Sequence, residues 1–170
     1  LIVSSIGSGK VYVFRETATN IWTEEYILTG IGSNFGQSIS TDGNTIVVGS
    51  PLEPTTGVIY VYTRVVNAWN SQIITALGLV VGDEFGEEVY VKGNLLLSSS
   101  VNRTSNSGSV FVFQYLNGVW NNATEITNPS DLQFFGSSLS IERNNIIIGV
   151  GDNPFDLGKI FVYSANNLLK

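Results

Sequence analysis

The sequence predicts an all-β protein that repeats one structural unit about every fifty residues. A Phe-Gly pair recurs at that spacing, beginning at Phe35, Phe85 and Phe135. A Gly-led apolar run recurs with spacings of 48, 51 and 50 residues, as GKVYVF, GVIYVY, GSVFVF and GKIFVY. These runs are short, rich in Val, Ile, Tyr and Phe, and bounded by turn residues, which is typical of strands. No apolar period of 3.6 residues lasts for an ordinary helix length, so we expect no long helices.

The four strands expected in a unit are best seen in the second repeat. The first strand begins at Phe35-Gly36, the second is NTIVVGSP, the third is the run led by Gly57, and the fourth carries Trp69. The opening residues LIVSS resemble the second run, so we expect the chain to begin at the second strand of a unit. This reading predicts fourteen strands, distributed as three in unit 1–34, four in unit 35–84, four in unit 85–134 and three in unit 135–170.

Short turns are expected between the first and second strands of each unit. Asp42-Gly43 is typical of a two-residue hairpin turn with positive φ at both positions. Lys92-Gly93 and Asn144-Asn145 occupy the matching places in the later units. The links PLEPTTG, VNRTSNSG and GDNPFDLG are polar loops that lead to the next Gly-led strand. The strands of a unit are therefore expected to form an antiparallel sheet.

The composition of the Gly-led strands predicts that each sheet is covered on both faces. The strands of a sheet with one solvent-exposed face alternate apolar and polar residues, whereas VYVF, VIYVY and VFVF are apolar at every position. Repeated four-stranded antiparallel sheets stacked in this way are the blades of a β-propeller. Propellers close with about four to eight blades, and about three and a half are present in this chain. We therefore expect residues 1–170 to be one segment of a larger ring or assembly.

The repeated aromatic residues are expected to have a packing role. The Phe rings would fill the wedge between neighbouring sheets, and the adjacent Gly would let backbone approach closely. The same role is expected of the Trp residues, and the alternative for any one of them is to line a ligand groove. These markers are Phe35, Gly36, Phe85, Gly86, Phe135 and Gly136, together with Trp22, Trp69 and Trp120.

Composition and charge exclude several classes of function. The net charge is −6 and the chain holds only eight Lys and Arg residues, so we expect neither a nucleic acid nor an anionic membrane surface as partner. No run approaches the roughly 18 apolar residues of a membrane-spanning helix, so membrane insertion is not expected. The chain contains no Cys and no His, which excludes Ser-His-Asp and Cys-His catalytic groups, His or Cys zinc sites and disulfides within it.

The carboxylates do not suggest a catalytic pair. Glycoside hydrolysis needs two carboxyl groups about 5 to 10 Å apart across a sugar site. Glu87 and Glu88 are adjacent on a predicted strand and would point to opposite faces, while Asp131 lies in a predicted loop. We therefore predict that this chain is not an enzyme.

The repeat pattern resembles the FG-GAP repeat of integrin-α-type propellers, in the shorter variant whose first hairpin lacks a metal loop. The resemblance rests on FGxS, a short turn, a strand ending VGSP, a loop, GxVYVF and Trp, and it covers essentially the whole chain. It implies a β-propeller and an adhesion-type role outside the cell. Repeats of this family often hold calcium in a loop of D-x-D-x-D-G type. Here the matching hairpins read STDGN, VKGN and ERNN, with Asp42 as the acidic residue of the first, so no cofactor is expected and calcium is the alternative.

Two acidic stretches and two glycosylation sequons complete the candidate sites. GDEFGEE and GDNPFDLG are expected to be solvated turns, with a weak metal site as the alternative. N-x-[ST] sequons begin at Asn102 and Asn122, both in predicted turns from which a glycan could project. The acidic residues concerned are Asp83, Glu84, Glu87, Glu88, Asp152 and Asp156.

The sequence as a whole favours a non-enzymatic interaction module that acts outside the cell or at its surface. Loops on a rigid scaffold commonly carry recognition, so a protein or glycan partner is expected. The alternative is a structural subunit or segment of a surface appendage, sheath or filament, in which further copies or blades provide the contacts. Fold alone does not choose between these functions.

Overall fold

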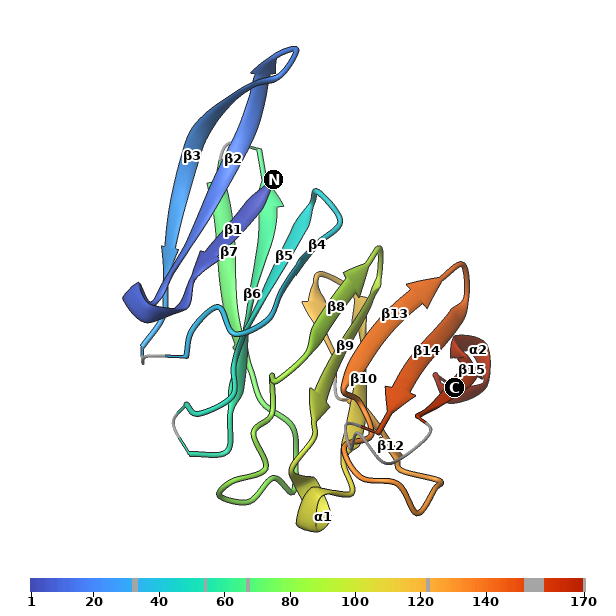
Figure 1. Ribbon diagram of the computed structural model, residues 1–170. Coiled ribbons are helices and arrows are strands. Elements are labelled where there is room, and N and C mark those ends of the chain that lie inside the picture. Colours follow the sequence, from blue (N-terminus) through green and yellow to red (C-terminus); the bar gives the residue numbers. More distant parts are fainter. Residues whose placement is uncertain (32–33, 54, 67, 122, 152–157, 170) are drawn as a thin grey trace.

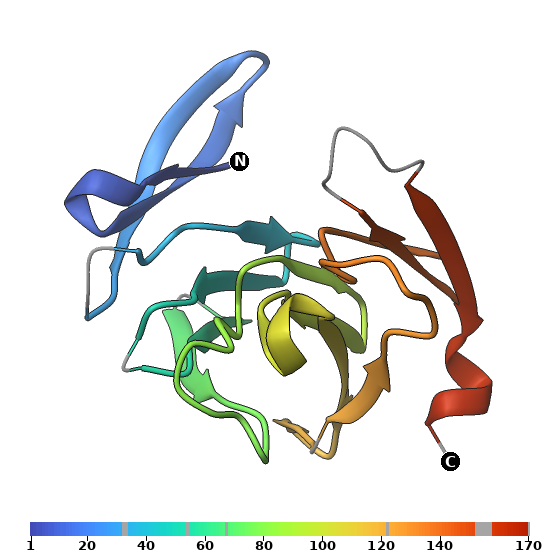
Figure 2. The same ribbon diagram turned by 60° about the horizontal axis from the view of Figure 1, so that its bottom comes forward.

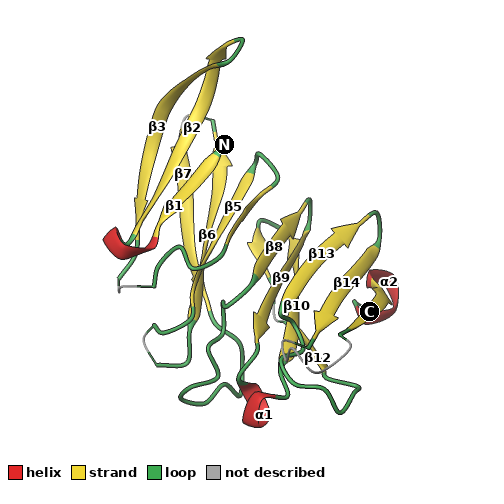
Figure 3. Ribbon diagram, viewed as in Figure 1, coloured by secondary structure: helices red, strands yellow, loops and turns green. Residues whose placement is uncertain are grey.

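A computed structural model describes the chain over residues 1–31, 34–53, 55–66, 68–121, 123–151 and 158–169. Within these residues the protein is all-β, with fifteen strands in four antiparallel sheets (Figures 1 and 3). The sheets follow one another in chain order, and Figure 2 shows the N-terminus with the first sheet and the C-terminus with the last. The described residues form no closed ring of sheets.

Sheets 1 and 2 come from the first half of the chain. Sheet 1 consists of β1 (Ile2–Ser5), β2 (Lys10–Ala18) and β3 (Ile21–Thr29), with the 3-10 turn η1 (Ile6–Ser8) between β1 and β2. Sheet 2 consists of β4 (Ile39–Thr41), β5 (Thr45–Ser50), β6 (Val58–Val65) and β7 (Ala68–Ile74). In both sheets each strand pairs with its neighbour in sequence, so the chain runs as a simple meander.

Sheets 3 and 4 continue the same order of strands. Sheet 3 consists of β8 (Val89–Lys92), β9 (Leu95–Ser100), β10 (Ser109–Leu116), β11 (Val119–Trp120) and β12 (Thr124–Thr127). Sheet 4 consists of β13 (Ser138–Glu142), β14 (Asn145–Val150) and β15 (Lys159–Ser164). The one-turn helices α1 (Arg103–Asn106) and α2 (Ala165–Leu168) lie between β9 and β10 and after β15. The count exceeds the expected fourteen because the fourth strand of sheet 3 is divided into β11 and β12.

The first hairpin turn differs from the sequence prediction. Thr41 pairs with Ile46, so the centre of the turn is Gly43-Asn44 rather than Asp42-Gly43, and of these residues only Gly43 has positive φ. The reason is that Asp42 acts as a cap, because its Oδ1 accepts hydrogen bonds from the N–H groups of Asn44 and Thr45.

The matching turns of the later sheets are also displaced from their predicted positions. Lys92 pairs with Leu95, which places Gly93-Asn94 at the centre of the turn in sheet 3. In sheet 4 the centre is Arg143-Asn144, with φ of +55° at Arg143.

The hydrophobic core is divided into three clusters, one between each pair of successive sheets. Alternate residues of one strand belong to different clusters: Val48 of β5 faces sheet 1, whereas Val47 faces sheet 3. Every residue of β5 and of β9 is buried, so the prediction of two covered faces is confirmed for sheets 2 and 3. It is wrong for sheets 1 and 4, because no described sheet covers their outer faces: Tyr12 and Phe14 of sheet 1 are only half-buried, and Ile160 and Val162 of sheet 4 are 73% and 62% exposed.

The prediction that each Phe-Gly pair begins a first strand is wrong: each pair lies in a turn before β4, β8 or β13, and it packs against the preceding sheet. Phe35, Phe85 and Phe135 are fully buried. The Phe85 ring meets that of Phe111 edge to face at 5.4 Å between centroids. Gly86 has φ of +98°, and a Cβ placed on it would lie 2.7 Å from the carbonyl oxygen of Val58 in sheet 2. A side chain at this position would therefore push sheets 2 and 3 apart.

The three Trp residues do not share one environment. Trp120 is buried, at 7% exposure, and Trp69 is partly buried against the cluster between sheets 1 and 2. The guanidinium carbon of Arg64 lies 5.3 Å from the centre of the Trp69 ring. Trp22 is 47% exposed on β3, so the expected packing role does not hold for Trp22.

Candidate functional site

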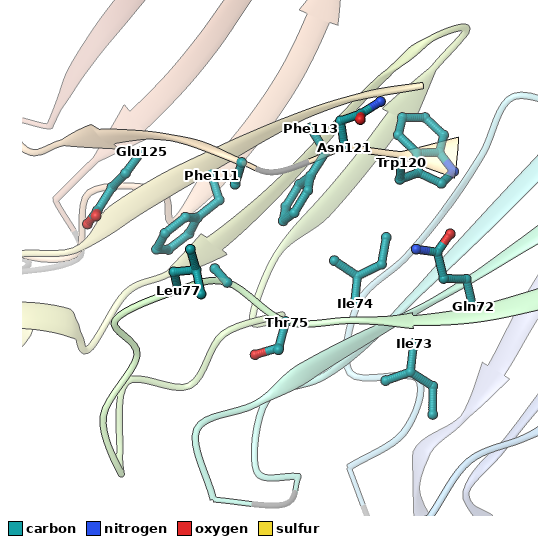
Figure 4. Close-up of a pocket in the computed structure, with 12 residues that line it drawn as sticks. Gln72, Ile73, Ile74, Thr75, Leu77, Phe111, Phe113, Trp120, Asn121 and Glu125 are labelled. Atoms are coloured by element: carbon teal, nitrogen blue, oxygen red, sulfur yellow. The ribbon is translucent and has the colours of Figure 1, made fainter. Parts of the chain in front are cut away.

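A groove of about 460 Å³ lies between sheets 2 and 3 (Figure 4). One wall is β7 with the three residues that follow it, and the other is formed by β10, β11 and β12. In Figure 4 the side chains of Phe111, Phe113 and Trp120 lie along one wall, and those of Ile74 and Leu77 lie along the opposite one. The complete lining is Gln72, Ile73, Ile74, Thr75, Ala76, Leu77, Phe111, Phe113, Trp120, Asn121, Ala123 and Glu125.

The interrupted fourth strand of sheet 3 shapes one wall of the groove. β11 pairs with the end of β10 through Tyr115 and Trp120, and β12 pairs with its beginning through Val112 and Thr124. The two registers differ by one residue, so the strand that contains β11 and β12 carries one extra residue, as in a β-bulge. The change of register falls opposite the part of β10 that contains Phe113, a residue of the groove lining.

Trp120 supplies a buried donor at one end of the groove. Its Nε1 is buried, and among the described residues it has no hydrogen-bond partner. Its ring is tilted against Tyr115, with 5.1 Å between the ring centroids. Figure 4 places Gln72 across from it at the same end of the groove. A buried N–H without an acceptor is costly, so a carbonyl oxygen that entered here would relieve that cost.

The rim of the groove combines apolar and neutral polar side chains. Leu77 is 86% exposed although it follows a strand whose last residue, Ile74, is buried. Gln72, Thr75 and Asn121, which also line the groove, are exposed. Ile73 belongs to the lining, but in Figure 4 its side chain points away from the aromatic residues. The accessible surface is thus an apolar depression with amide and hydroxyl groups at its edge.

Arg103 of α1 fixes the end of the groove near Glu125. Its Nε lies 2.7 Å from Glu125 Oε1, and its Nη1 lies 2.7 Å from Asp83 Oδ2 and donates to the Gly78 carbonyl at 2.9 Å. Its guanidinium carbon lies 5.6 Å from the centre of the Phe111 ring. One cation therefore joins the segment after β7 to β12 and packs on the aromatic wall.

The charges at this end are mutually stabilised. Burial alone would raise the pKa of Glu125, but hydrogen bonds from Arg103 and Ser109 outweigh it, and the net pKa is lowered. The hydrogen bond to Glu125 raises the pKa of Arg103 further, so the guanidinium stays charged. A carboxylate that is ionised and paired in this way is a poor general acid.

The predicted acidic sites are engaged in local structure. Asp42 accepts hydrogen bonds from its own turn through Oδ1 and from the Gly93 N–H through Oδ2, at 2.8 Å. Asp83 is bound to Arg103. Among the described residues no three acidic side chains are grouped as metal ligands. Asp152 and Asp156 lie outside the described residues.

The prediction that Glu87 and Glu88 lie on a strand is wrong, because both lie in the turn before β8. Both reach toward sheet 2, where Glu87 contacts Gln37 Nε2 at 3.4 Å and Glu88 contacts Ser38 Oγ at 3.2 Å. Burial raises the pKa of both carboxyl groups. They point to the same neighbouring sheet because the turn, unlike a strand, does not alternate its side chains.

Of the two sequon asparagines, the described residues include Asn102 and not Asn122. Asn102 is half-buried at the start of α1, where its carbonyl accepts a hydrogen bond from the Asn106 N–H. Asn122 lies outside the described residues.

For Trp120 the sequence predicted a packing role with groove lining as the alternative, and Trp120 both is buried and lines the groove. The sequence did not indicate Arg103, Gln72 or Leu77. One signal was available: the segment ALGLVV before Phe85 is apolar, whereas ILTGIGSN and ITNPSDLQ precede the other two Phe-Gly pairs. An apolar segment outside the expected strands indicates a surface that differs from the rest of the repeat.

A comparison with protein-family models gives no match to this chain, and a comparison with curated proteins gives none. Within the part of the chain that the structure describes, no helix is both long and apolar enough to cross a bilayer.

Proposed function

We propose that this protein is a non-enzymatic interaction module of the β-propeller type, whose four sheets are consecutive blades. Support comes from the order of the sheets and from their common mode of packing through a Phe-Gly pair. The first strands also follow one another, since β4 contacts β8 and β8 contacts β13. A fold of this type provides a rigid scaffold on which recognition surfaces are placed.

The recognition surface in this proposal is the groove between sheets 2 and 3. The single observation that carries it is the buried Nε1 of Trp120, which has no partner among the described residues and lies in an apolar groove. Binding sites of this kind are mainly apolar, with a few placed polar groups that orient the ligand. Trp120 would donate to a ligand carbonyl while the apolar walls hold a side chain.

A protein segment fits the groove better than a glycan. Sugars stack on the open face of an aromatic ring, but Phe111 and Phe113 are each 2% exposed and leave no open ring face for stacking. The exposed Leu77 and the rim amides instead suit an extended peptide with an aliphatic or aromatic residue. The partner in our proposal is therefore a protein segment of this chemistry.

The proposed place of action is outside the cell or at its surface. The net charge of −6 disfavours nucleic acids and anionic membranes as partners, and the Asn102 sequon is compatible with secretion. No cofactor forms part of the proposal.

A displayed library of short random peptides, selected on the parent protein, tests the groove. We expect enriched peptides to share an apolar or aromatic residue, and to lose binding at least ten-fold when Leu77→Lys places a charge on the apolar wall. The matched control is Val81→Lys, because Val81 is 76% exposed in the same segment but does not line the groove.

The same selection can reject the proposal. Peptides that bind both variants as well as the parent would place recognition elsewhere. Failure to enrich any peptide, with retention of the protein on an immobilised glycan panel, would replace the peptide by a sugar ligand.

A structural role in a surface assembly is the second candidate. The observation that favours it is the exposure of Ile160 and Val162 on the last sheet. Self-association that survives L77K would support this role, because it would require a surface other than the groove.

A further inference from the structure

The last sheet repeats the surface by which sheet 2 holds sheet 3. We call the side of a sheet that faces the following sheet its forward face. In sheet 2, strand pairing aligns Ser40, Val47 and Val61 across this face, and Ser38, Gly49 and Ile59 beside them. In sheet 4 the corresponding rows are Ser140, Ile147 and Val162, and Ser138, Gly149 and Ile160.

The two equivalent faces differ completely in exposure. Ile59 and Val61 of sheet 2 are 0% and 1% exposed because sheet 3 covers them. Their counterparts Ile160 and Val162 are 73% and 62% exposed. Removing such side chains from water is favourable, so a sheet that covered this face of sheet 4 would be stabilised there.

Polar side chains of sheet 2 also bind the edge of sheet 3. Ser38 Oγ accepts a hydrogen bond from the Val89 N–H at 3.0 Å, and Ser40 Oγ accepts one from the Val91 N–H at 3.1 Å. Ser38, just before β4, and Ser40 within it thereby satisfy alternate N–H groups of β8, whose edge would otherwise be unpaired. Sheet 4 carries Ser138 and Ser140 at the same places.

A glycine completes the correspondence. A Cβ on Gly49 would collide with the carbonyl oxygen of Gly86, so sheet 2 needs a glycine there to admit the Phe-Gly turn of sheet 3. Sheet 4 has Gly149 at that position, where the hydroxyl of Ser138 in the same sheet lies against the place of a Cβ, and no backbone of a following sheet is among its nearest described atoms.

Sheet 3 shows that this surface is not a general property of the repeat. Its forward face carries Tyr90 and Lys92 on β8 and Ser99 in place of the glycine. Lys92 donates a hydrogen bond to the Ile141 carbonyl of sheet 4 at 3.1 Å. Ser38 and Ser40 of sheet 2 instead accept hydrogen bonds from the following sheet. Sheets 2 and 4 thus present one kind of surface, and sheet 3 presents another.

We propose that the forward face of sheet 4 is the docking site of a further antiparallel sheet of the sheet 3 type, with a Phe-Gly pair leading a first strand whose alternate N–H groups are free. Ser138 and Ser140 bind those N–H groups, Gly149 receives the Phe-Gly backbone, and Ile147, Ile160 and Val162 are covered. This inference does not depend on the groove.

A second copy of the chain fits this face less well. The uncovered sheet at the other end is sheet 1, whose β1 pairs with β2 as β5 pairs with β6 and therefore corresponds to a second strand. The described residues of sheet 1 include no Phe-Gly-led strand for Ser138 and Ser140 to bind. The backward face of sheet 3 in a second copy is already covered by its own sheet 2.

The test extends the full chain after Lys170 by a second copy of residues 70–127, which contain residues 70–74 of β7, the segment with Phe85-Gly86, and all of sheet 3. The period of the repeat aligns Lys170 with Trp69, so the added residues continue in register. Because the chain has no Cys, the variant Val162→Cys gives a single thiol on the receiving face. We expect thiol labelling to be at least ten-fold slower in the extended V162C protein than in V162C alone.

Two matched variants separate docking from general ordering. Val3→Cys places a thiol on sheet 1, where Val3 is 45% exposed, and its labelling should not change on extension. Adding Ser138→Ala and Ser140→Ala to the extended V162C protein should restore faster labelling, because the N–H groups of the added strand lose their acceptors. Unchanged labelling at V162C on extension, or slowing of V3C and V162C alike, would overturn the proposal. A dimer of the unextended chain that is abolished by Ile160→Lys would assign the face to a second copy instead.

Discussion

Sheets 2 and 4 have nearly the same residues on their forward faces, yet one face is core and the other is surface. Ile59 in sheet 2 is fully buried, and Ile160 at the same place in sheet 4 is 73% exposed. The strand pairing around both residues is alike, since Ile59 pairs with Gly49 and Ile160 with Gly149. The difference comes entirely from the presence of sheet 3 on one side.

The repeat pattern therefore determines that a sheet has apolar faces, but it does not determine whether each face is buried. A strand with apolar residues at every position can support two interfaces, and it forms as many as it has neighbours. The energetic role of a repeated residue therefore depends on its position along the row of sheets, as in other repeat proteins. Matched substitutions at equivalent positions measure that dependence directly.

The largest expected difference is at the aliphatic pair. Ile59→Ala should lower the free energy of unfolding by about 2 to 5 kcal/mol, because it opens a cavity between sheets 2 and 3. Ile160→Ala should change it by less than about 0.5 kcal/mol, as at other exposed sites. Urea denaturation followed by fluorescence measures both. Equal losses at the two positions would show that a neighbour also covers sheet 4 in solution.

The next effect concerns two glycines with similar backbone angles but different surroundings. Gly86 has φ of +98° and approaches Val58, whereas Gly43 has φ of +96° with no atom within 4 Å of an added Cβ. Both alanine variants carry the strain of positive φ, but G86A must also separate two sheets, at a further cost of about 1 to 3 kcal/mol. Thermal unfolding of the two variants tests this, and a smaller loss in G86A than in G43A would contradict it.

An effect of comparable size is expected for the serines that face the next sheet. Ser40→Ala leaves the buried Val91 N–H without its acceptor and should cost about 1 to 3 kcal/mol. Ser140→Ala should cost little, because no described hydrogen bond joins Ser140 to a neighbouring sheet. Ser40→Thr is the control, since it keeps the hydroxyl. If S40A were as stable as S140A in urea, the hydrogen bond from the Val91 N–H to Ser40 would make no measurable contribution to the free energy of unfolding.

The smallest effect is a difference in pH dependence between carboxylates at two interfaces. Burial raises the pKa of Glu88 in the folded state, so folding favours its protonated form. The stability of the parent relative to Glu88→Gln should therefore rise as the pH falls from 7 toward the ordinary pKa of a glutamate. In sheet 1, the hydrogen bond from Arg15 lowers the pKa of Glu25, with Arg64 contributing. The parent should lose stability relative to Glu25→Gln over the acid range below that ordinary pKa.

Urea titrations of E88Q, E25Q and the parent at several pH values distinguish the two trends. If the free energy of unfolding of each variant changed with pH as that of the parent does, the environment of neither carboxylate would differ between the folded and the unfolded chain.

Local sequence patterns predicted much of the fold. The class, the four groups of strands and their antiparallel order followed from Phe-Gly pairs, Gly-led runs and strand composition, because these are local preferences that need no distant partner. The hairpin turns were misplaced, since the side chain of Asp42 caps its own turn and shifts the centre to Gly43-Asn44. A choice of this kind depends on hydrogen bonds that propensity does not contain.

The candidate groove was largely beyond the sequence. Trp22, Trp69 and Trp120 hold matching places in the repeat, but only Trp120 combines burial with an N–H lacking a partner among the described residues. The bulge between β11 and β12 and the bridge from Arg103 to two acidic residues create that setting. Both join segments from different parts of the chain, and no spacing in the sequence reveals such contacts.

The sequence by itself determined that this protein is all-β, acidic, free of Cys and His, and built from a repeat whose strands can be covered on both sides. The tertiary structure alone decided which faces are covered, where the interrupted strand opens a groove, and which glutamates lie against a neighbouring sheet. The physical reason is that strand formation depends on local backbone and side-chain preferences, whereas burial and electrostatics depend on which other part of the protein packs against the strand. Ile59 and Ile160 show both: the local pairing is the same, and the environment is opposite.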